Sequence, residues 1–270
     1  MRMLGLAKFI FRINVILSII IIILLLLSHI LANARANKEI KVMVLDTGIG
    51  YNDLLRPYVQ YKNSDDYEDE VGHGTHVTGI IVYGNKMQKG SINLSDAICK
   101  NVKIYSCKYY STKWSEKSRG ERIADCINFA KQNKFDYINY SGGGSSFLFH
   151  EYEAMKKYTD NGGIVVAAAG NDRKNIEKNP YYPASYAFPR KNANNQYEFK
   201  KIKNLIVVGN IQRNGDYGDT TSYARNIKWE VGTNIYSTYP NNGFETLTGT
   251  SQSTAAYLHR LLKEKCNKKE

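Results

Sequence analysis

Short apolar runs alternate with amphipathic stretches over most of this chain, and the two patterns predict different elements. The apolar runs have the length of buried strands and are rich in β-branched or aromatic residues. They occupy residues 40–45, 98–106, 135–140, 164–169 and 205–209. The stretches with helical periodicity are residues 121–133, 151–159 and 252–265. Such alternation predicts an α/β fold in which helices cover both faces of a mostly parallel central sheet.

The first 36 residues have the pattern of an export signal. Three basic residues among the first twelve precede an apolar run over residues 15–31, and the small-residue sequence Ala-Asn-Ala-Arg-Ala follows at 32–36. This order is typical of a cleaved signal peptide. The apolar run is also just long enough for an uncleaved anchor that would tether the protein to a membrane. In both cases we expect residues 37–270 to be exported as one domain, either secreted or anchored.

The composition favours a globular protein with a solvated basic surface. Hydrophobic residues make up 43% of the chain, which excludes a disordered protein, and the net charge is +12. The lysines that produce this charge are dispersed, and no zinc-knuckle or aromatic RNA-binding motif accompanies them, so we expect no nucleic-acid partner.

Four cysteines bear on the stability of an exported chain. An even number permits two disulfides in an oxidising compartment, and three pairings are possible. The residues are Cys99, Cys107, Cys126 and Cys266. Free buried thiols are the alternative, and the sequence alone does not choose between these arrangements.

Two segments that adjoin predicted elements carry residues suited to catalysis. Asp46 ends the run 40–45 and precedes Thr-Gly, and the carboxyl end of a strand is where sites form in α/β sheets. An Asp in a turn before glycine is the alternative. Ser251 follows Gly-Thr at the start of a helical stretch, where unpaired N–H groups could stabilise an oxyanion. A simple N-cap serine is the alternative there.

Two histidines and an asparagine extend this set. His73 lies between two glycines, an open position from which its ring could reach a nucleophile, and His76 follows three residues later. No Glu completes a His-Glu-x-x-His motif, so we assign no metal ligands. Asn171 follows the run 164–169 and offers an amide donor at the end of a strand. The acidic residues at 65–70 most simply form a solvated loop, with a calcium site or a preference for basic substrate residues as alternatives.

The chain order Asp46, His73, Ser251 is the order of the catalytic triad in subtilisin. Five motifs in register around these residues resemble the subtilisin-like serine proteases, the subtilase family. They are DTGI at 46–49, HGTHV at 73–77, NYSGGG at 139–144, AAGN at 168–171 and GTS at 249–251. Supporting stretches are YPA at 182–184, VVG at 207–209 and TSYA at 221–224. The resemblance extends over about residues 40 to 262.

The resemblance implies a three-layer α/β fold and an exported serine endopeptidase that acts on proteins or peptides. It implies that Ser251 is the nucleophile, that His73 is the general base and acid, and that Asp46 orients the imidazole. It further implies that Asn171 donates a side-chain hydrogen bond to the oxyanion. The chemistry needs no cofactor, although a structural calcium ion remains possible.

The resemblance also implies where a substrate would bind. Ser141, Gly142 and Gly143 resemble the segment that pairs with the substrate backbone as an added strand. Gly142 stands where an apolar residue is usual in the family, so we expect looser pairing. Tyr181 falls near the floor of the primary specificity pocket and is expected to narrow it toward small side chains.

Other departures favour a second hypothesis. Ser253 and Ala255 replace the Ala and Pro that usually follow the nucleophile, and the Tyr182–Pro183 bond is expected to be cis as in the family. We see no room for a pro-segment between residues 36 and 40, and only 19 residues follow Ser251. The alternative is therefore a catalytically weak protein of this fold, retained to bind peptides or a partner.

Overall fold

The computed structural model describes residues 19–29, 38–61, 67–112, 119–191 and 197–267. It consists of two compact units, one formed by Met1–Glu39 with Asn267–Glu270 and the other by Ile40–Cys266. In the first unit, residues 19–29 form a helix with exposed side chains. Within the described ranges, no helix combines the length and the apolar character that crossing a membrane requires.

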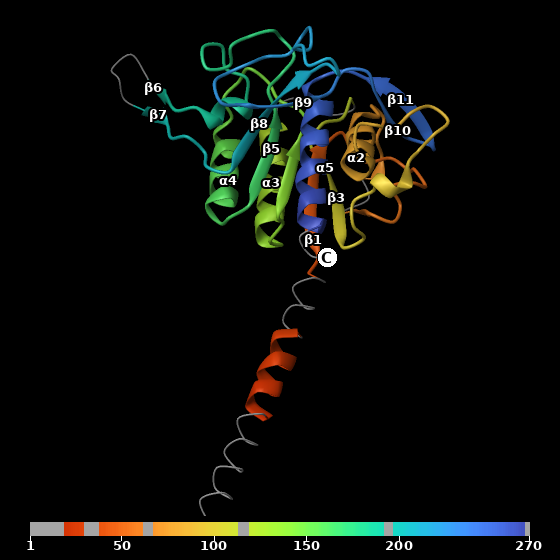
Figure 1. Cartoon of the computed structure of the whole chain (residues 1–270). Helices are drawn as coiled ribbons and strands as arrows, with labels where there is room; N and C mark the ends of the chain where they lie inside the picture. The colour runs from red at the N-terminus through yellow and green to blue at the C-terminus, as the bar shows by residue number, and fades with distance from the viewer. Residues whose placement is uncertain (1–18, 30–37, 62–66, 113–118, 192–196, 268–270) are drawn as a thin grey trace, which may run out of the picture. The chain divides into compact units, whose positions relative to one another are not determined.

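The second unit is built on a seven-stranded parallel sheet with the order β2-β3-β1-β4-β5-β8-β9 (Figure 1). Its strands are β1 (Ile40–Asp46), β2 (Val59–Tyr61), β3 (Val102–Lys108), β4 (Tyr137–Tyr140), β5 (Ile164–Ala168), β8 (Leu205–Ile211) and β9 (Lys228–Val231). The parallel sheet predicted from the apolar runs is confirmed.

Helices cover the two faces of this sheet, because alternate residues of a strand point to opposite sides. Val42 and Val44 of β1 pack in one apolar cluster with α2 (His73–Tyr83) and α5 (Thr250–Asn267). Met43 and Leu45 pack in another with α3 (Arg119–Gln132) and α4 (Phe149–Asp160). All four of these β1 residues are at most 1% exposed, so the strand is buried on both faces. The three layers agree with the predicted fold class.

Smaller elements complete the unit. Two antiparallel hairpins join β6 (Arg190–Lys191) to β7 (Tyr197–Phe199) and β10 (Ile235–Tyr239) to β11 (Gly243–Leu247). Two short 3-10 helices are η2 (Leu94–Asp96) and η4 (Ala184–Ala187). The apolar pattern does not predict these elements because they are short.

Two predicted strands begin later than expected. The run 98–106 becomes a strand only at Val102, because the Val102 N–H bonds the Cys99 carbonyl and closes a turn. The run 135–140 becomes a strand only at Tyr137. There, Phe135 donates to the Ala130 carbonyl and Lys134 has a positive φ of 54°, so these residues end the preceding helix.

The chain path creates a switch point between β1 and β4. From β1 the chain passes through β2 and then α2, which packs on one face of the sheet, whereas from β4 it passes into α4 on the other face. In open α/β sheets, ligand sites form outside the carboxyl ends of strands at such a point. The ends of β1 and β4 are therefore where the fold itself favours a site.

Two disulfides pair all four cysteines of the chain. Cys99 bonds Cys266 near the end of α5, across 167 residues of sequence. Cys107 on β3 bonds Cys126 on α3, across 19 residues. The first bond ties the last helix to the loop before β3, and the second ties a sheet strand to the helix that covers it.

Removing the disulfides should destabilise the protein by amounts that follow the size of the closed loops. The entropy of the unfolded chain predicts a loss of about 5 kcal/mol for Cys99→Ala/Cys266→Ala and about 3 kcal/mol for Cys107→Ala/Cys126→Ala. Urea unfolding of the two double variants beside the wild type measures both losses. A larger loss for the 19-residue pair would contradict this explanation.

Candidate active site

Asp46 and His73 form the first contact of the candidate site. Asp46 is the last residue of β1 and is 2% exposed, and its Oδ1 lies 2.8 Å from His73 Nδ1. The same oxygen accepts the Thr47 N–H at 2.8 Å. His73 is the first residue of α2, and Gly72 before it has a φ of 83° and no room for a side chain beside the Tyr239 ring. This glycine lets the chain turn so that the ring faces Asp46.

The electrostatic environment favours the protonated form of His73. Burial lowers the pKa of the ring, but the charge and hydrogen bond of Asp46, with a further contribution from the charge of Asp69, outweigh that effect. The pKa of His73 therefore lies above its ordinary value. An imidazole in this position accepts a proton readily and is held in one orientation by the Asp46 oxygen.

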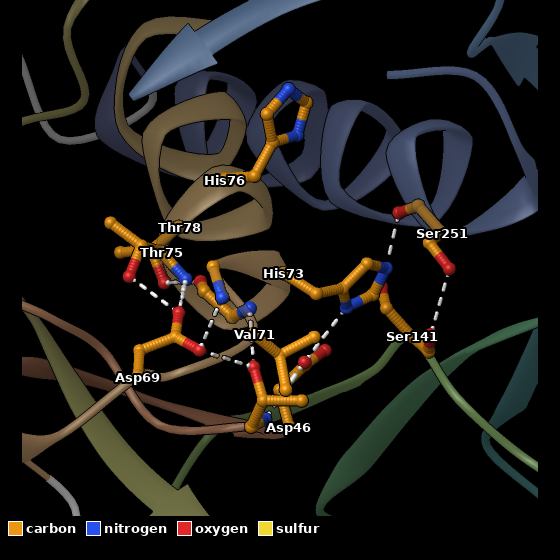
Figure 2. Close-up of polar contacts among 12 residues, drawn as sticks. Asp46, Asp69, Val71, His73, Thr75, His76, Thr78, Ser141 and Ser251 are labelled. Carbon is orange, nitrogen blue, oxygen red and sulfur yellow. Dashed lines mark hydrogen bonds and ion pairs between the residues drawn. The ribbon is translucent and has the colours of Figure 1, made fainter. Parts of the chain in front are cut away.

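Ser251 lies on the other side of the imidazole. Figure 2 shows the His73 ring between the Asp46 carboxylate and the Ser251 side chain. The Ser251 hydroxyl donates to the Ser141 carbonyl at 2.7 Å, and the Ser141 hydroxyl donates back to the Ser251 carbonyl at 3.0 Å. In this arrangement the Ser251 hydroxyl donates its hydrogen to the Ser141 carbonyl.

The start of α5 supplies hydrogen-bond donors next to this hydroxyl. Ser251 is the second residue of the helix, where the backbone N–H has no intrahelical acceptor. Asn171 lies beside it, and its Oδ1 accepts both the N–H and the hydroxyl of Thr250, at 3.0 and 3.1 Å. Since the amide oxygen is held by Thr250, the amide nitrogen of Asn171 remains as a donor on the exposed side of the loop.

The amino-acid sequence identifies the protein family of this chain. A sequence profile of the subtilase family matches residues 37–257. The chain belongs to the subtilase family. The four residues proposed for catalysis all fall within the matched range.

Individual relatives of this subtilase differ in length and location. This chain is 30% identical to the minor extracellular protease Epr of Bacillus subtilis (strain 168). The 234 aligned residues cover 84% of this chain and 32% of Epr. This chain is 32% identical over 236 residues to the major intracellular serine protease of the same strain, covering 82% and 67% of the two chains. This subtilase therefore spans about a third of the length of Epr.

A solved structure shares the fold of this subtilase. The crystal structure of a cold adapted subtilisin-like serine proteinase matches it with a TM-score of 0.65 and 20% identity, covering 85% of this chain and 77% of that one. At this level of identity the similarity concerns the fold.

The segment after β4 is tightly packed against neighbouring loops. Gly144 exchanges two backbone hydrogen bonds with Tyr182, at 2.9 and 2.7 Å. A Cβ on Gly142 would lie 1.9 Å from the Tyr109 hydroxyl. The Tyr109 hydroxyl thus occupies the space in which a side chain at position 142 would stand.

Tyr181 lies between the two segments that flank the candidate specificity pocket. Its ring is 2.8 Å from the Cβ position of Gly143 and 3.0 Å from that of Gly170. The Tyr182–Pro183 peptide bond that follows is cis, as expected. The phenol ring is therefore packed between the segment after β4 and the loop at Gly170.

His76 has a structural role in this subtilase. It is fully buried, its Nε2 contacts the carbonyls of Ile235 and Glu245 at 3.1 Å each, and its Nδ1 faces the Gln252 amide at 3.4 Å. Burial lowers the pKa of His76 to about 4 despite these hydrogen bonds. The neutral ring joins α2 to the β10–β11 hairpin and to α5.

The expectation of a solvated acidic loop is wrong for part of residues 65–70. Asp65 and Asp66 lie outside the described residues, but Asp69 is 8% exposed and accepts four hydrogen bonds. Glu70 pairs with Lys108 and Ser111, and after the opposing effect of burial these contacts lower its pKa to about 2. Within the parts of the chain that are described, no group of three His, Cys, Asp or Glu residues is placed to hold a metal ion.

A second buried carboxyl group also escaped the sequence analysis. Glu151 is 1% exposed, its Oε2 accepts the Tyr186 hydroxyl at 3.1 Å, and its Oε1 has no partner among the described residues. Burial raises the pKa of Glu151 to about 7, against the effect of hydrogen bonds from Tyr140 and Tyr186. It lines a cavity of about 500 Å³ together with Gly143 and Gly144. A Glu near a helix start gives no local sign of burial.

The packing at Gly142 yields a stability prediction. Gly142→Ala should destabilise the protein by about 1–3 kcal/mol, because the new methyl group overlaps the Tyr109 hydroxyl. Tyr109→Phe in the same chain should recover most of that loss, since it removes the nearest atom. Urea unfolding measures both variants.

Gly120→Ala is the matched control for this pair. Its new Cβ would lie 3.5 Å from the nearest atom and would replace a glycine in α3, so stability should stay the same or rise by up to about 1 kcal/mol. A Gly142→Ala variant as stable as the wild type would contradict the packing explanation.

Proposed function

We propose that this subtilase is a serine endopeptidase in which Asp46, His73 and Ser251 act together. The observation that carries the proposal is the 2.8 Å contact between Asp46 and His73, with the Ser251 side chain on the opposite side of the ring. An aspartate bound to Nδ1 leaves Nε2 as the basic nitrogen that faces the serine. That is the arrangement needed to activate a hydroxyl group.

In the proposed reaction a small rotation of the Ser251 side chain turns its hydroxyl from the Ser141 carbonyl to His73. His73 takes the hydroxyl proton as Ser251 Oγ attacks the carbonyl carbon of a peptide bond. The oxyanion that forms accepts hydrogen bonds from the Asn171 amide and the Ser251 N–H. His73 then protonates the leaving amine. Water, deprotonated by His73, hydrolyses the acyl-enzyme and restores the Ser251 hydroxyl.

We propose that the substrate binds as an extended peptide along Ser141, Gly142 and Gly143. These residues continue β4 beyond its last paired residue, Tyr140, so their backbone lies at the carboxyl end of the sheet. An extended chain pairs naturally with such a segment. The Tyr181 ring beside Gly143 then limits the size of the side chain next to the cleaved bond.

We further propose that the protein is exported, with residues 1–36 acting as a signal peptide or residues 15–31 as a membrane tether. The basic start and the apolar run support this proposal. The two disulfides are also typical of an oxidising compartment.

The catalytic roles predict a ranked loss of activity. Ser251→Ala or His73→Ala should lower kcat by about 10⁶-fold, and loss of the Asn171 amide by about 10²–10³-fold; both magnitudes are those established for subtilisin. Casein cleavage and labelling by a fluorophosphonate, which reacts with activated serines, measure these losses.

Because His73 must be neutral to accept a proton and its pKa is raised, the acidic limb of kcat/KM should have its midpoint above the ordinary pKa of histidine.

Ser253→Ala is the matched control, because this buried serine lies two residues further along the same helix. It should retain labelling and cleavage. A folded wild type that neither cleaves casein nor reacts with the reagent would remove the enzyme proposal and leave the hypothesis of a peptide-binding protein.

The position of Tyr181 predicts a change of specificity. Tyr181→Ala should raise kcat/KM by at least about 10-fold for peptides with Phe or Leu next to the cleaved bond, relative to peptides with Ala. Cleavage of a peptide library by the wild type and the variant measures the shift. Tyr236→Ala, on the β10–β11 hairpin, is the control and should leave the ranking unchanged. An unchanged ranking in the Tyr181 variant would show that the ring does not limit the pocket.

A further inference from the structure

Asp69 is a buried carboxylate whose hydrogen bonds surround His73. Its Oδ1 accepts the Thr47 hydroxyl at 2.7 Å and the Gly72 N–H at 2.8 Å. Its Oδ2 accepts the N–H of Thr75 at 2.8 Å and the hydroxyl of Thr75 at 2.6 Å. Figure 2 shows this carboxylate below the start of α2, with its bonds directed to the residues around His73. Asp69 therefore fixes the backbone immediately before His73 and two residues after it.

Thr47 extends this hydrogen-bond network from Asp69 to Asp46, the partner of His73. Its hydroxyl donates to Asp69 and accepts the Gly74 N–H at 2.9 Å, while its backbone N–H donates to Asp46 Oδ1 at 2.8 Å. That Asp46 oxygen is the one in contact with His73. A Cβ on Gly74 would lie 2.0 Å from the Gly48 carbonyl, so the two loops touch with no space for adjustment. A shift of Asp69 is thus transmitted to Asp46 and to His73 together.

The charge of Asp69 acts on His73 as well. Four donors directed at one carboxyl group favour its ionised form, and they oppose the rise in the pKa of Asp69 that burial causes. Among the described residues, the other charge that acts on the ring is that of Asp46 at the end of β1. The charge of Glu70, the residue next to Asp69, is balanced by Lys108. His76, one turn along α2, is neutral near pH 7.

We propose that Asp69 is a positioning residue of this active site, which holds the Asp46–His73 pair in register through Thr47 and through the first turn of α2. The inference rests on the proposed function, because it assigns His73 the role of general base. As the ring takes up the serine proton, the negative charge of Asp69 helps Asp46 to stabilise the imidazolium. Asp69 itself touches neither the serine nor the substrate.

A purely structural role is the competing explanation. A carboxylate that accepts first-turn N–H groups also caps a helix, and its loss would then lower stability alone. The two explanations differ in their effect on His73: loss of a residue that only caps the helix leaves kcat and the exchange of the His73 Nδ1 proton unchanged, whereas loss of a positioning residue changes both. The test must therefore measure proton exchange and titration of the ring in addition to activity.

The experiment compares the full chain with Asp69→Asn by NMR titration of His73, with the signal assigned by its loss in His73→Gln. Asp69→Asn should lower the pKa of His73, because a negative charge near the imidazolium is removed. The acidic limb of kcat/KM should move to lower pH by the same amount. At the pH optimum kcat should fall about 10- to 100-fold with KM changed less than about twofold, because the pair loses its alignment.

Thr47 variants separate the effect of aligning Asp46 with His73 from the effect of the Asp69 charge. Thr47→Val keeps the charge of Asp69 but breaks its link to Asp46, so it should lower kcat and speed the exchange of the His73 Nδ1 proton. Thr47→Ser keeps the hydroxyl and should restore both. Losses in Asp69→Asn and Thr47→Val should not add in the double variant, because both remove the same connection. Asp160→Asn, which removes an exposed carboxylate of α4, should change nothing.

The following results would overturn the inference or separate it from the proposed function. A folded Asp69→Asn protein with the wild-type His73 titration overturns the inference, as do additive losses in the double variant. If Asp69→Asn does not fold, Thr47→Val with unchanged kcat and unchanged proton exchange overturns it. If the wild type shows no cleavage that depends on Ser251 while Asp69→Asn still lowers the pKa of His73, the proposed function fails and the positioning of the pair stands.

Discussion

The parallel pairing of β1 with β4 is the constraint on which the candidate site depends. The register places Val44 opposite Asn139, and continuing it by two residues places Asp46 opposite Ser141. Ser141 in turn exchanges two hydrogen bonds with Ser251. The position of the serine relative to the aspartate is therefore set by backbone pairing in the middle of the sheet. His73 completes the arrangement because hydrogen bonds to Asp46 and Thr47 hold the first turn of α2 at the end of β1.

The start of α5 is a polar segment that is buried with its side-chain hydrogen bonds satisfied. Five consecutive residues, from 250 to 254, are at most 8% exposed, and all carry hydroxyl or amide groups. Each finds a partner. Thr250 bonds Asn171, Ser251 donates to the Ser141 carbonyl, and Gln252 faces His76. Ser253 bonds the Gly249 carbonyl and Asn210, and Thr254 donates to the Thr250 carbonyl. Burial of unpaired hydroxyl groups would be unfavourable. The serine at position 253, unusual for the family, is accommodated by these bonds.

The sequence was sufficient for the features that local patterns determine. Asp46, His73, Asn171 and Ser251 could be proposed because each stands in a short motif beside a predicted element. Five of the seven strands of the central sheet could be predicted from their apolar residues, whereas β2 and β9 could not. The role of Asp69 could not be predicted, because a carboxylate in an acidic run looks solvated until the loop is seen folded against Thr47. Glu151 was missed because a Glu near the start of a helix gives no local sign of burial. The disulfide pairing stayed open because it joins segments up to 167 residues apart.

The contact between Tyr109 and Gly142 also limits the paths by which this protein can change over evolutionary time. With the phenol hydroxyl in place, position 142 accepts only glycine without displacement of its neighbour. A larger residue at 142 becomes tolerable only after position 109 has lost its hydroxyl group. The order of the two substitutions is therefore not free.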